Sequence, residues 1–384
     1  GQKAPDHSTI ARFRTGFLLE ACEDLFYQMV CRLKDAGELS VETVFIDGTK
    51  FEACANKYTF VWKKSVGKWE EKMFQKIQEA VMLLNHEYMQ SFSVKIDSRI
   101  QDLQTITRYL ENKCQQDGTV FVYGRGKRKS KNQKYFELFR KFQERQVTYD
   151  WHTASFQGRN NYCKTDPDAT FMHMKDDDMR NAQLKPGYNI QIGVDSEYIV
   201  ATDVFSDRNN VWTLIPFLKT MDEKLGFRYP SVTADSGYES EEGYTYLRET
   251  RQTPYIKPQT YEKWKRRSFK QDISKRENMA YDAETDVYIC YAQKKLSPVF
   301  VKKQKSKSGY ESEVTVYECE DCKDCPHKEK CTRAKGNKRL YVSKSFLEKR
   351  QESYENILTE TGIQYRMNRS IQVEGAFGVL KNNY

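Results

Sequence analysis

Two short apolar runs that each end in an aspartate constrain this chain more than any other feature. Residues 44–46 are followed by Asp47, and the run 231–234 is followed by Asp235. Each run predicts a short buried strand with a carboxylate at its end. A carboxylate is costly to bury unless something pairs with it. We therefore expect each aspartate to have a positively charged partner.

A third carboxylate lies near the end of the sequence. Glu374 stands in residues 371–381, whose apolar spacing predicts a helix. Two-metal phosphoryl chemistry needs oxygen ligands around divalent ions about 3.5–4 Å apart. Two aspartates at strand ends and one glutamate on a late helix suit that need, so we predict a phosphodiester-processing site built from Asp47, Asp235 and Glu374. A turn or helix-capping role is the alternative for each aspartate taken singly.

The basic side chains are clustered. The chain of 384 residues has a net charge of +9, and Lys and Arg gather in residues 125–131, 263–267 and 302–307. Such runs suit a polyanion such as DNA, and solvated loops are the alternative. The first run supplies four candidate DNA-binding side chains: Arg125, Lys127, Arg128 and Lys129.

Three more basic residues share the predicted last helix with Glu374. Arg366 and Arg369 precede it by one to two turns, and Lys381 follows on the same helix face. We predict that these side chains hold DNA phosphates, with surface solvation as the alternative.

Half of the ten cysteines fall within residues 290–331. This asymmetry indicates a reduced, cytosolic protein with one local metal site instead of a secreted disulfide framework. The spacing of four of them favours a structural Zn²⁺ site: Cys319, Cys322, Cys325 and Cys331. Cys290 is an alternative ligand in place of Cys319, and unligated thiols are the alternative to a metal. We expect zinc to fold a polar insertion that lacks a core of its own.

Periodicity and composition divide the chain into six segments. Strands followed by alternating strands and helices indicate a mixed α/β sheet with helices on its faces. A turn is expected at Pro186-Gly187, between strand-like residues 169–174 and 188–194. The predicted segments are an N-terminal helical segment (1–43), a first part of the core (44–59), a helical insertion (60–158), the central core (159–257), a Cys-rich basic insertion (258–350) and a C-terminal helix (351–384).

Membrane and secretion signals are missing from the sequence. No run of about 18 apolar residues occurs, and the first fifteen residues do not form a signal peptide. We predict no membrane partner and a cytoplasmic location. Because the sequence begins without Met and stops without a helix cap, we expect it to be part of a longer protein.

Six segments together carry a resemblance to a known family: residues 44–50, 56–62, 166–170, 186–191, 233–238 and 369–381. On these segments the sequence resembles the transposases of bacterial insertion sequences that use an Asp-Asp-Glu (DDE) triad in a ribonuclease-H-like fold, and most of all the group numbered eleven eighty-two. The resemblance implies a ribonuclease-H-like mixed sheet with flanking helices, interrupted by the helical and the Cys-rich insertions. It also implies that residues 1–43 are the remnant of a DNA-binding domain.

The resemblance further implies the chemistry. Asp47, Asp235 and Glu374 would be the triad, with Mg²⁺ or Mn²⁺ as cofactor. The chain would cleave and join DNA at the terminal inverted repeats of the element and in target DNA, as a homodimer at the bacterial nucleoid. Lys381 stands at the spacing that a signature of related transposases expects after the glutamate, whereas Ser370 and Met367 stand where that signature has Arg and Tyr. The alternatives are a catalytically inactive DNA-binding or regulatory remnant and a ribonuclease-H-like nuclease.

Overall fold

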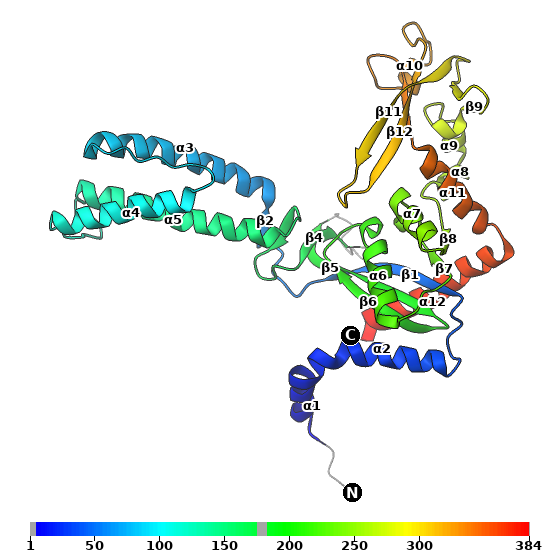
Figure 1. Ribbon diagram of the computed structural model, residues 1–384, viewed down its shortest axis with the longest axis horizontal. Coiled ribbons are helices and arrows are strands. Elements are labelled where there is room, and N and C mark those ends of the chain that lie inside the picture. Colours follow the sequence, from blue (N-terminus) through cyan, green and yellow to red (C-terminus); the bar gives the residue numbers. More distant parts are fainter. Residues whose placement is uncertain (1–4, 175–182, 384) are drawn as a thin grey trace. The chain divides into compact units, whose positions relative to one another are not determined.

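Two compact units make up the computed structural model of this chain, which describes residues 5–174 and 183–383 without the side chains of 380–383 (Figure 1). The first, here named the core unit, consists of Gly1–Thr49 and Asn189–Tyr384. The second, here named the helical unit, consists of Lys50–Tyr188. All three predicted carboxylates belong to the core unit.

A mixed sheet runs through the structure in the strand order β4-β5-β1-β7-β8, with β6 paired to β5. β1, β7 and β8 are parallel neighbours, whereas β5 pairs antiparallel with both β4 and β6. The bounds are Thr43–Glu52 for β1, Thr170–His173 for β4, Leu184–Asp195 for β5, Tyr198–Phe205 for β6, Ser231–Ala234 for β7 and Thr253–Ile256 for β8. The predicted mixed sheet is confirmed, and within it β5 and β6 form an antiparallel hairpin.

Alternation along β1 sends its side chains into two different cores. Val44 and Ile46 pack in a large cluster with helices on one face of the sheet. Phe45 packs in a second cluster, with Val373 and Phe377 of the last helix. The helices on the first face are α2 (Leu19–Asp35), α6 (Leu214–Leu225) and α7 (Glu241–Glu249), and the last helix is α12 (Glu360–Asn383). The residue two positions after Phe45, Asp47, is therefore directed towards the side of α12.

The expected turn at Pro186-Gly187 is wrong, because both residues lie inside β5. Proline lacks a backbone donor, but the Pro186 carbonyl accepts a hydrogen bond from the Ala53 N–H (2.9 Å). Gly187 lies so close to β1 that an added β-carbon would come 2.4 Å from the Phe51 carbonyl oxygen. Proline and glycine often occur in turns, but at these positions they allow β5 to lie close to β1.

Three long helices build the helical unit and lie alongside one another in Figure 1. They are α3 (Lys63–Tyr88), α4 (Arg99–Gln116) and α5 (Lys131–Phe156). Apolar side chains of the three helices meet in one core that includes Ile77, Leu103 and Phe139. Two short strands, β2 (Phe60–Trp62) and β3 (Asn161–Cys163), pair antiparallel in this unit.

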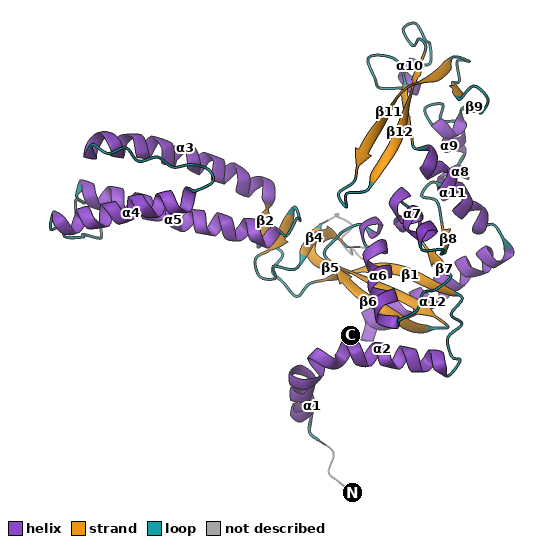
Figure 2. Cartoon of the chain, viewed as in Figure 1, coloured by secondary structure: helices purple, strands orange, loops and turns teal. Residues whose placement is uncertain are grey.

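The Cys-rich segment contains a five-stranded antiparallel sheet, which Figure 2 shows as orange arrows. Its strands are β9 (Ala280–Asp282), β10 (Val287–Ile289), β11 (Lys295–Lys305), β12 (Glu311–Cys319) and β13 (Arg339–Val342). Leu296, Tyr317 and Leu340 pack together with Cys319 and Cys322 in a buried cluster. The expectation that this insertion lacks its own core is therefore wrong, because strand pairing gathers apolar residues that are far apart in sequence.

The remaining helices of the described residues are mostly short. They are α1 (His7–Phe13), the π-helix η1 (Arg14–Leu18), the 3₁₀ turns η2 (Asn210–Trp212), η3 (Ser236–Tyr238) and η4 (Arg276–Asn278), and α8 (Tyr261–Trp264), α9 (Arg267–Lys270), α10 (Lys328–Cys331) and α11 (Lys344–Asn356). Within the residues that the structure describes, no helix is both long and apolar enough to cross a bilayer.

Candidate active site

Strand register brings two of the predicted carboxylates to neighbouring positions. β1 and β7 run parallel with Ile46 opposite Ala234, so the next residues on the two strands are Asp47 and Asp235. β7 ends at Ala234, as predicted, but β1 continues to Glu52. Asp47 therefore lies inside its strand and not at its end, at the point where pairing with β7 stops.

A glycine N–H holds each aspartate. The Gly48 N–H donates to Oδ1 of Asp47 at 2.8 Å, and the Gly237 N–H donates to Oδ1 of Asp235 at 2.8 Å. Asp235 also caps the N-terminus of η3. Hydrogen bonds from backbone N–H groups to a carboxylate are among the stronger ones in proteins, so both side chains have a fixed orientation.

The last helix supplies a cation to this site. Nη1 of Arg369 lies 3.2 Å from Oδ2 of Asp47, and the two side chains are only 19% and 11% exposed. The two groups form an ion pair but not a hydrogen bond. Among the described residues, the buried Nη1 atom has no hydrogen-bond partner. Arg369, a predicted phosphate ligand, thus contacts a predicted catalytic residue.

Glu374 lies on the same helix but is exposed, and its Oε1 accepts a hydrogen bond from the Ser370 hydroxyl at 3.2 Å. Its neighbour Val373 is fully buried against the face of the sheet that carries Phe45. Among the residues that the structure describes, no three His, Cys, Asp or Glu side chains are placed to hold one metal ion. The structure thus places Asp47, Asp235 and Arg369 close to one another. Glu374 lies on the same helix as Arg369, but its carboxylate does not come together with those of Asp47 and Asp235 to form one metal site.

The other predicted DNA-binding residues have varied surroundings. Nη1 of Arg366 donates to the Tyr261 hydroxyl at 3.4 Å. In the helical unit Lys129 forms an ion pair with Glu137 at 2.5 Å, while Arg125, Lys127 and Arg128 are exposed. Lys381 lies in α12, but its side chain is outside the described residues.

Five thiols and one imidazole line a small cavity in the Cys-rich segment. Its volume is about 20 Å³, close to that of a single bound atom. The lining includes Cys290, Cys319, Cys322, Cys325, Cys331 and His327. The Lys338 N–H points at Sγ of Cys322 at 3.4 Å. Burial and the neighbouring Cys322 thiol raise the pKa of Cys319 to about 12. All four predicted zinc ligands and the alternative Cys290 thus line one cavity, although no three of them are placed to hold a metal ion in the described structure.

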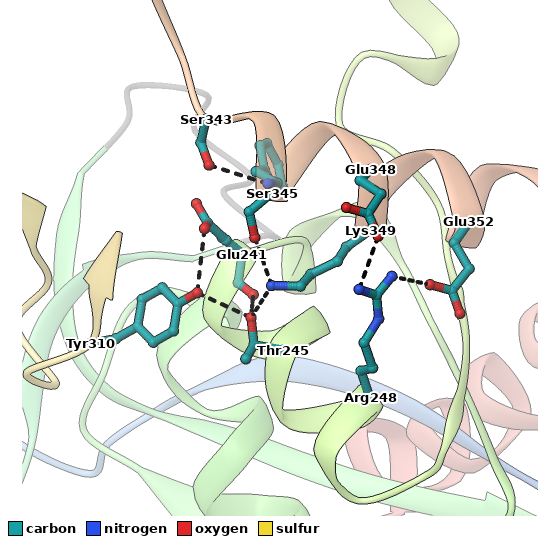
Figure 3. A network of polar contacts seen from close by, with 10 residues as sticks. Glu241, Thr245, Arg248, Tyr310, Ser343, Ser345, Glu348, Lys349 and Glu352 are labelled. Atoms are coloured by element: carbon teal, nitrogen blue, oxygen red, sulfur yellow. Dashed lines mark hydrogen bonds and ion pairs between the residues drawn. The ribbon is translucent and has the colours of Figure 1, made fainter. Parts of the chain in front are cut away.

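A polar network ties this segment to the helix that follows Asp235 (Figure 3). The Tyr310 hydroxyl, at the tip of the β11–β12 hairpin, lies 3.0 Å from Oγ1 of Thr245 and donates to Glu241 at 3.3 Å. Nζ of Lys349 on α11 donates to the same Thr245 oxygen at 2.7 Å. The hairpin tip, α7 and α11 are thereby linked.

One buried ion pair has a large expected effect on stability. Nε of Arg350 lies 2.8 Å from Oε1 of Glu239, and the side chains are 11% and 3% exposed. Burial raises the pKa of Glu239. Removing one partner leaves an uncompensated buried charge, so we expect Arg350→Ala to lower the free energy of unfolding by about 3–5 kcal/mol, measured by urea denaturation.

The matched control is Arg248→Ala. Arg248 bonds Glu348 at 3.0 Å and Glu352 at 2.8 Å, but its side chain is 46% exposed (Figure 3). An exposed pair contributes about 0–1 kcal/mol. Equal losses of stability in the two variants would show that burial does not distinguish the two pairs.

A set of buried polar residues beside the aspartates was not predicted from the sequence. Asn189, Gln191 and Tyr238 are at most 1% exposed and lie near Asp47 or Asp235. Two polar side chains at alternate positions of an otherwise apolar strand, Asn189 and Gln191, are the signal that would have identified them.

Comparison with known proteins adds one finding. A family model described as "Transposase DDE domain" matches residues 289–384. The matched segment contains the clustered cysteines and Glu374 but neither Asp47 nor Asp235. Neither the curated proteins nor the solved structures gave a match.

The fold of the core sheet, which lies outside the matched segment, is compatible with this match. The mixed sheet with helices on its faces is compatible with a ribonuclease-H-like DDE domain. Proteins with such domains generally use divalent metals such as Mg²⁺, and the domain implies DNA as a partner. The resemblance to the group numbered eleven eighty-two stays a prediction. The match over the last quarter of the chain supports a DDE transposase.

Proposed function

We propose that this chain is a transposase of the group numbered eleven eighty-two that cleaves and joins DNA at the ends of an insertion sequence. Asp47, Asp235 and Glu374 are its proposed carboxylates for Mg²⁺ or Mn²⁺. The observation that carries the proposal is the register of β1 and β7, which sets Asp47 beside Asp235. The ion pair of the Arg369 guanidinium with Asp47 supports the proposal that a cation binds at this position.

The side chains have separate roles in this proposal. Bound divalent ions would activate a water or a 3′-hydroxyl and stabilise the departing oxygen. Asp47 and Asp235, oriented by their glycine N–H groups, would hold them. Glu374 has to leave its bond with Ser370 to take part. Arg369 would release Asp47 and turn to a DNA phosphate, with Arg366 and Lys381 on the same helix.

DNA binding is proposed to involve more than the last helix. Arg125, Lys127 and Arg128 are exposed on the helical unit, and Lys129 lies beside them. The proposed substrates are the terminal inverted repeats and target DNA. A homodimer on DNA at the bacterial nucleoid follows from the resemblance, because transposition joins two ends.

Cleavage of a labelled element-end duplex tests this function. We expect cutting in Mg²⁺, none in EDTA, and binding that weakens steeply between 50 and 200 mM salt, because each neutralised phosphate releases counterions. Binding without cutting by the whole protein would favour the inactive remnant. Preferential cutting of RNA would favour a ribonuclease-H-like nuclease.

We also propose a structural Zn²⁺ in the cavity lined by the clustered cysteines. Its ligands would be Cys319, Cys322, Cys325 and Cys331, with Cys290 in place of Cys319 as the alternative. Four thiolates suit tetrahedral Zn²⁺, and a volume of about 20 Å³ leaves room for one ion. The thiols would have to rearrange to coordinate the ion, because they are not placed to hold one in the described structure.

A further inference from the structure

Four uncharged polar side chains form a network in the core beside the two aspartates. The Tyr238 hydroxyl donates to Oε1 of Gln191. Nε2 of Gln191 donates to Oδ1 of Asn189 at 2.9 Å and lies 3.4 Å from Oδ1 of Asn210. Nδ2 of Asn189 donates to the same Asn210 oxygen at 3.0 Å and to the Asp207 carbonyl at 3.0 Å. The network joins β5 to the two 3₁₀ turns η2 and η3.

One end of this network touches the glycine that holds Asp47. A β-carbon added at Gly48 would lie 2.1 Å from Nε2 of Gln191. The Gln191 amide therefore packs directly on the backbone whose N–H binds the Asp47 carboxylate. A shift of the Gln191 amide would therefore change its packing against the Gly48 backbone.

The other end lies near the glycine that holds Asp235. A β-carbon at Gly237 would lie 3.6 Å from Nδ2 of Asn210, and the Gly237 N–H binds the Asp235 carboxylate. Tyr238 is the next residue along the chain. The two glycines whose N–H groups orient the carboxylates thus lie beside two side chains of one network, Gln191 at Gly48 and Asn210 at Gly237.

The network has one low-energy arrangement. Gln191 and Tyr238 are fully buried and Asn189 is nearly so, and an unpaired polar atom at such depth is costly. The neutral Tyr238 hydroxyl has one proton to donate, and it donates it to Oε1 of Gln191. This bond sets the orientation of the Gln191 amide and, through it, those of Asn189 and Asn210.

We propose that Gln191 and Tyr238 are positioning residues that fix the separation of the Asp47 and Asp235 carboxylates for divalent-metal binding. The inference rests on the proposed function of that site. Groups that orient metal ligands typically change metal affinity about 10–100-fold when substituted. A network that only stabilised the core would change unfolding and leave metal affinity unaltered.

Mn²⁺ binding to the whole chain, followed by electron paramagnetic resonance, tests this proposal without relying on activity. We expect Tyr238→Phe to bind Mn²⁺ at least about 10-fold more weakly than the unsubstituted chain. The matched control is Tyr229→Phe, since Tyr229 is equally buried and its hydroxyl contacts Asp195 instead, at 3.2 Å. The control should bind Mn²⁺ as the unsubstituted chain does.

A second variant reaches the network from the other side. In Gly48→Ala the new methyl group displaces the Gln191 amide while all four network side chains remain. Mn²⁺ affinity should fall here as well. This variant decides the question if Tyr238→Phe does not fold.

Each result bears on the proposal. Unchanged affinity in the folded Tyr238→Phe or Gly48→Ala variant would overturn it, and so would equal weakening in Tyr238→Phe and Tyr229→Phe. Asp47→Asn separates the two levels of inference. If the unsubstituted chain binds Mn²⁺ and Asp47→Asn does not, the metal site stands whatever the tyrosine variants do. If the unsubstituted chain binds no Mn²⁺, the proposed site and the positioning role both fail.

Discussion

Asp235→Ala is expected to slow cleavage of an element-end duplex by at least about a thousandfold. Removing a metal-binding carboxylate lowers the stabilisation of the transition state by several kcal/mol. Each increase of about 1.36 kcal/mol in the activation free energy slows the reaction about tenfold. Asp47→Ala and Glu374→Ala should behave alike. DNA affinity should change little, because basic side chains supply the phosphate contacts. Single-turnover cleavage in Mg²⁺ and a parallel gel-shift titration measure the two effects.

The control for this prediction is another buried carboxylate of the same sheet. Asp195 accepts hydrogen bonds from the Ser40 hydroxyl at 2.7 Å and the Val41 N–H at 2.9 Å. Asp195→Asn should cost about 1–3 kcal/mol of stability but retain cleavage while the protein is folded. Full cleavage by Asp235→Ala, or a loss as large in folded Asp195→Asn, would remove Asp235 from the proposed triad.

Cys322→Ser is expected to lower the bound zinc from about one ion per chain to almost none, since a serine hydroxyl replaces a thiolate ligand. Apparent zinc-binding free energies in small finger peptides are about 10–16 kcal/mol. The loss here should be smaller, because the five-stranded sheet has its own buried cluster. Elemental analysis measures the metal, and limited proteolysis within residues 289–342 measures the local loosening.

The control is Cys114→Ser. Cys114 is a buried cysteine, 3% exposed, in the helical unit. This variant should retain its zinc. Absence of zinc from protein prepared without chelators would contradict the metal site, as would full zinc occupancy in Cys322→Ser.

Local patterns were sufficient to predict the core sheet and much of the helical unit. The apolar runs before Asp47 and Asp235 form β1 and β7, and the stripes on α3 and α4 face a common core. The sheet in the Cys-rich segment was not foreseen. Most of β11 is exposed and rich in lysine, so its strand character depends on pairing with β12 and leaves little apolar periodicity in the sequence.

The candidate site was predictable only in part. Short motifs identified Asp47 and Asp235, and strand register places them side by side. The ion pair between Arg369 and Asp47 could not be foreseen, because it joins residues from opposite ends of the chain. The same holds for the bond between Tyr238 and Gln191. Non-local contacts of this kind leave no periodic signal in either segment.

Anomalous diffraction from crystals grown with saturating Mn²⁺ tests the central claim most directly. The predicted result is a manganese peak within coordination distance of carboxylate oxygens of both Asp47 and Asp235, with Glu374 turned towards it and the Arg369 guanidinium withdrawn from Asp47. Crystals that show no manganese there, with Arg369 still paired to Asp47, would contradict it.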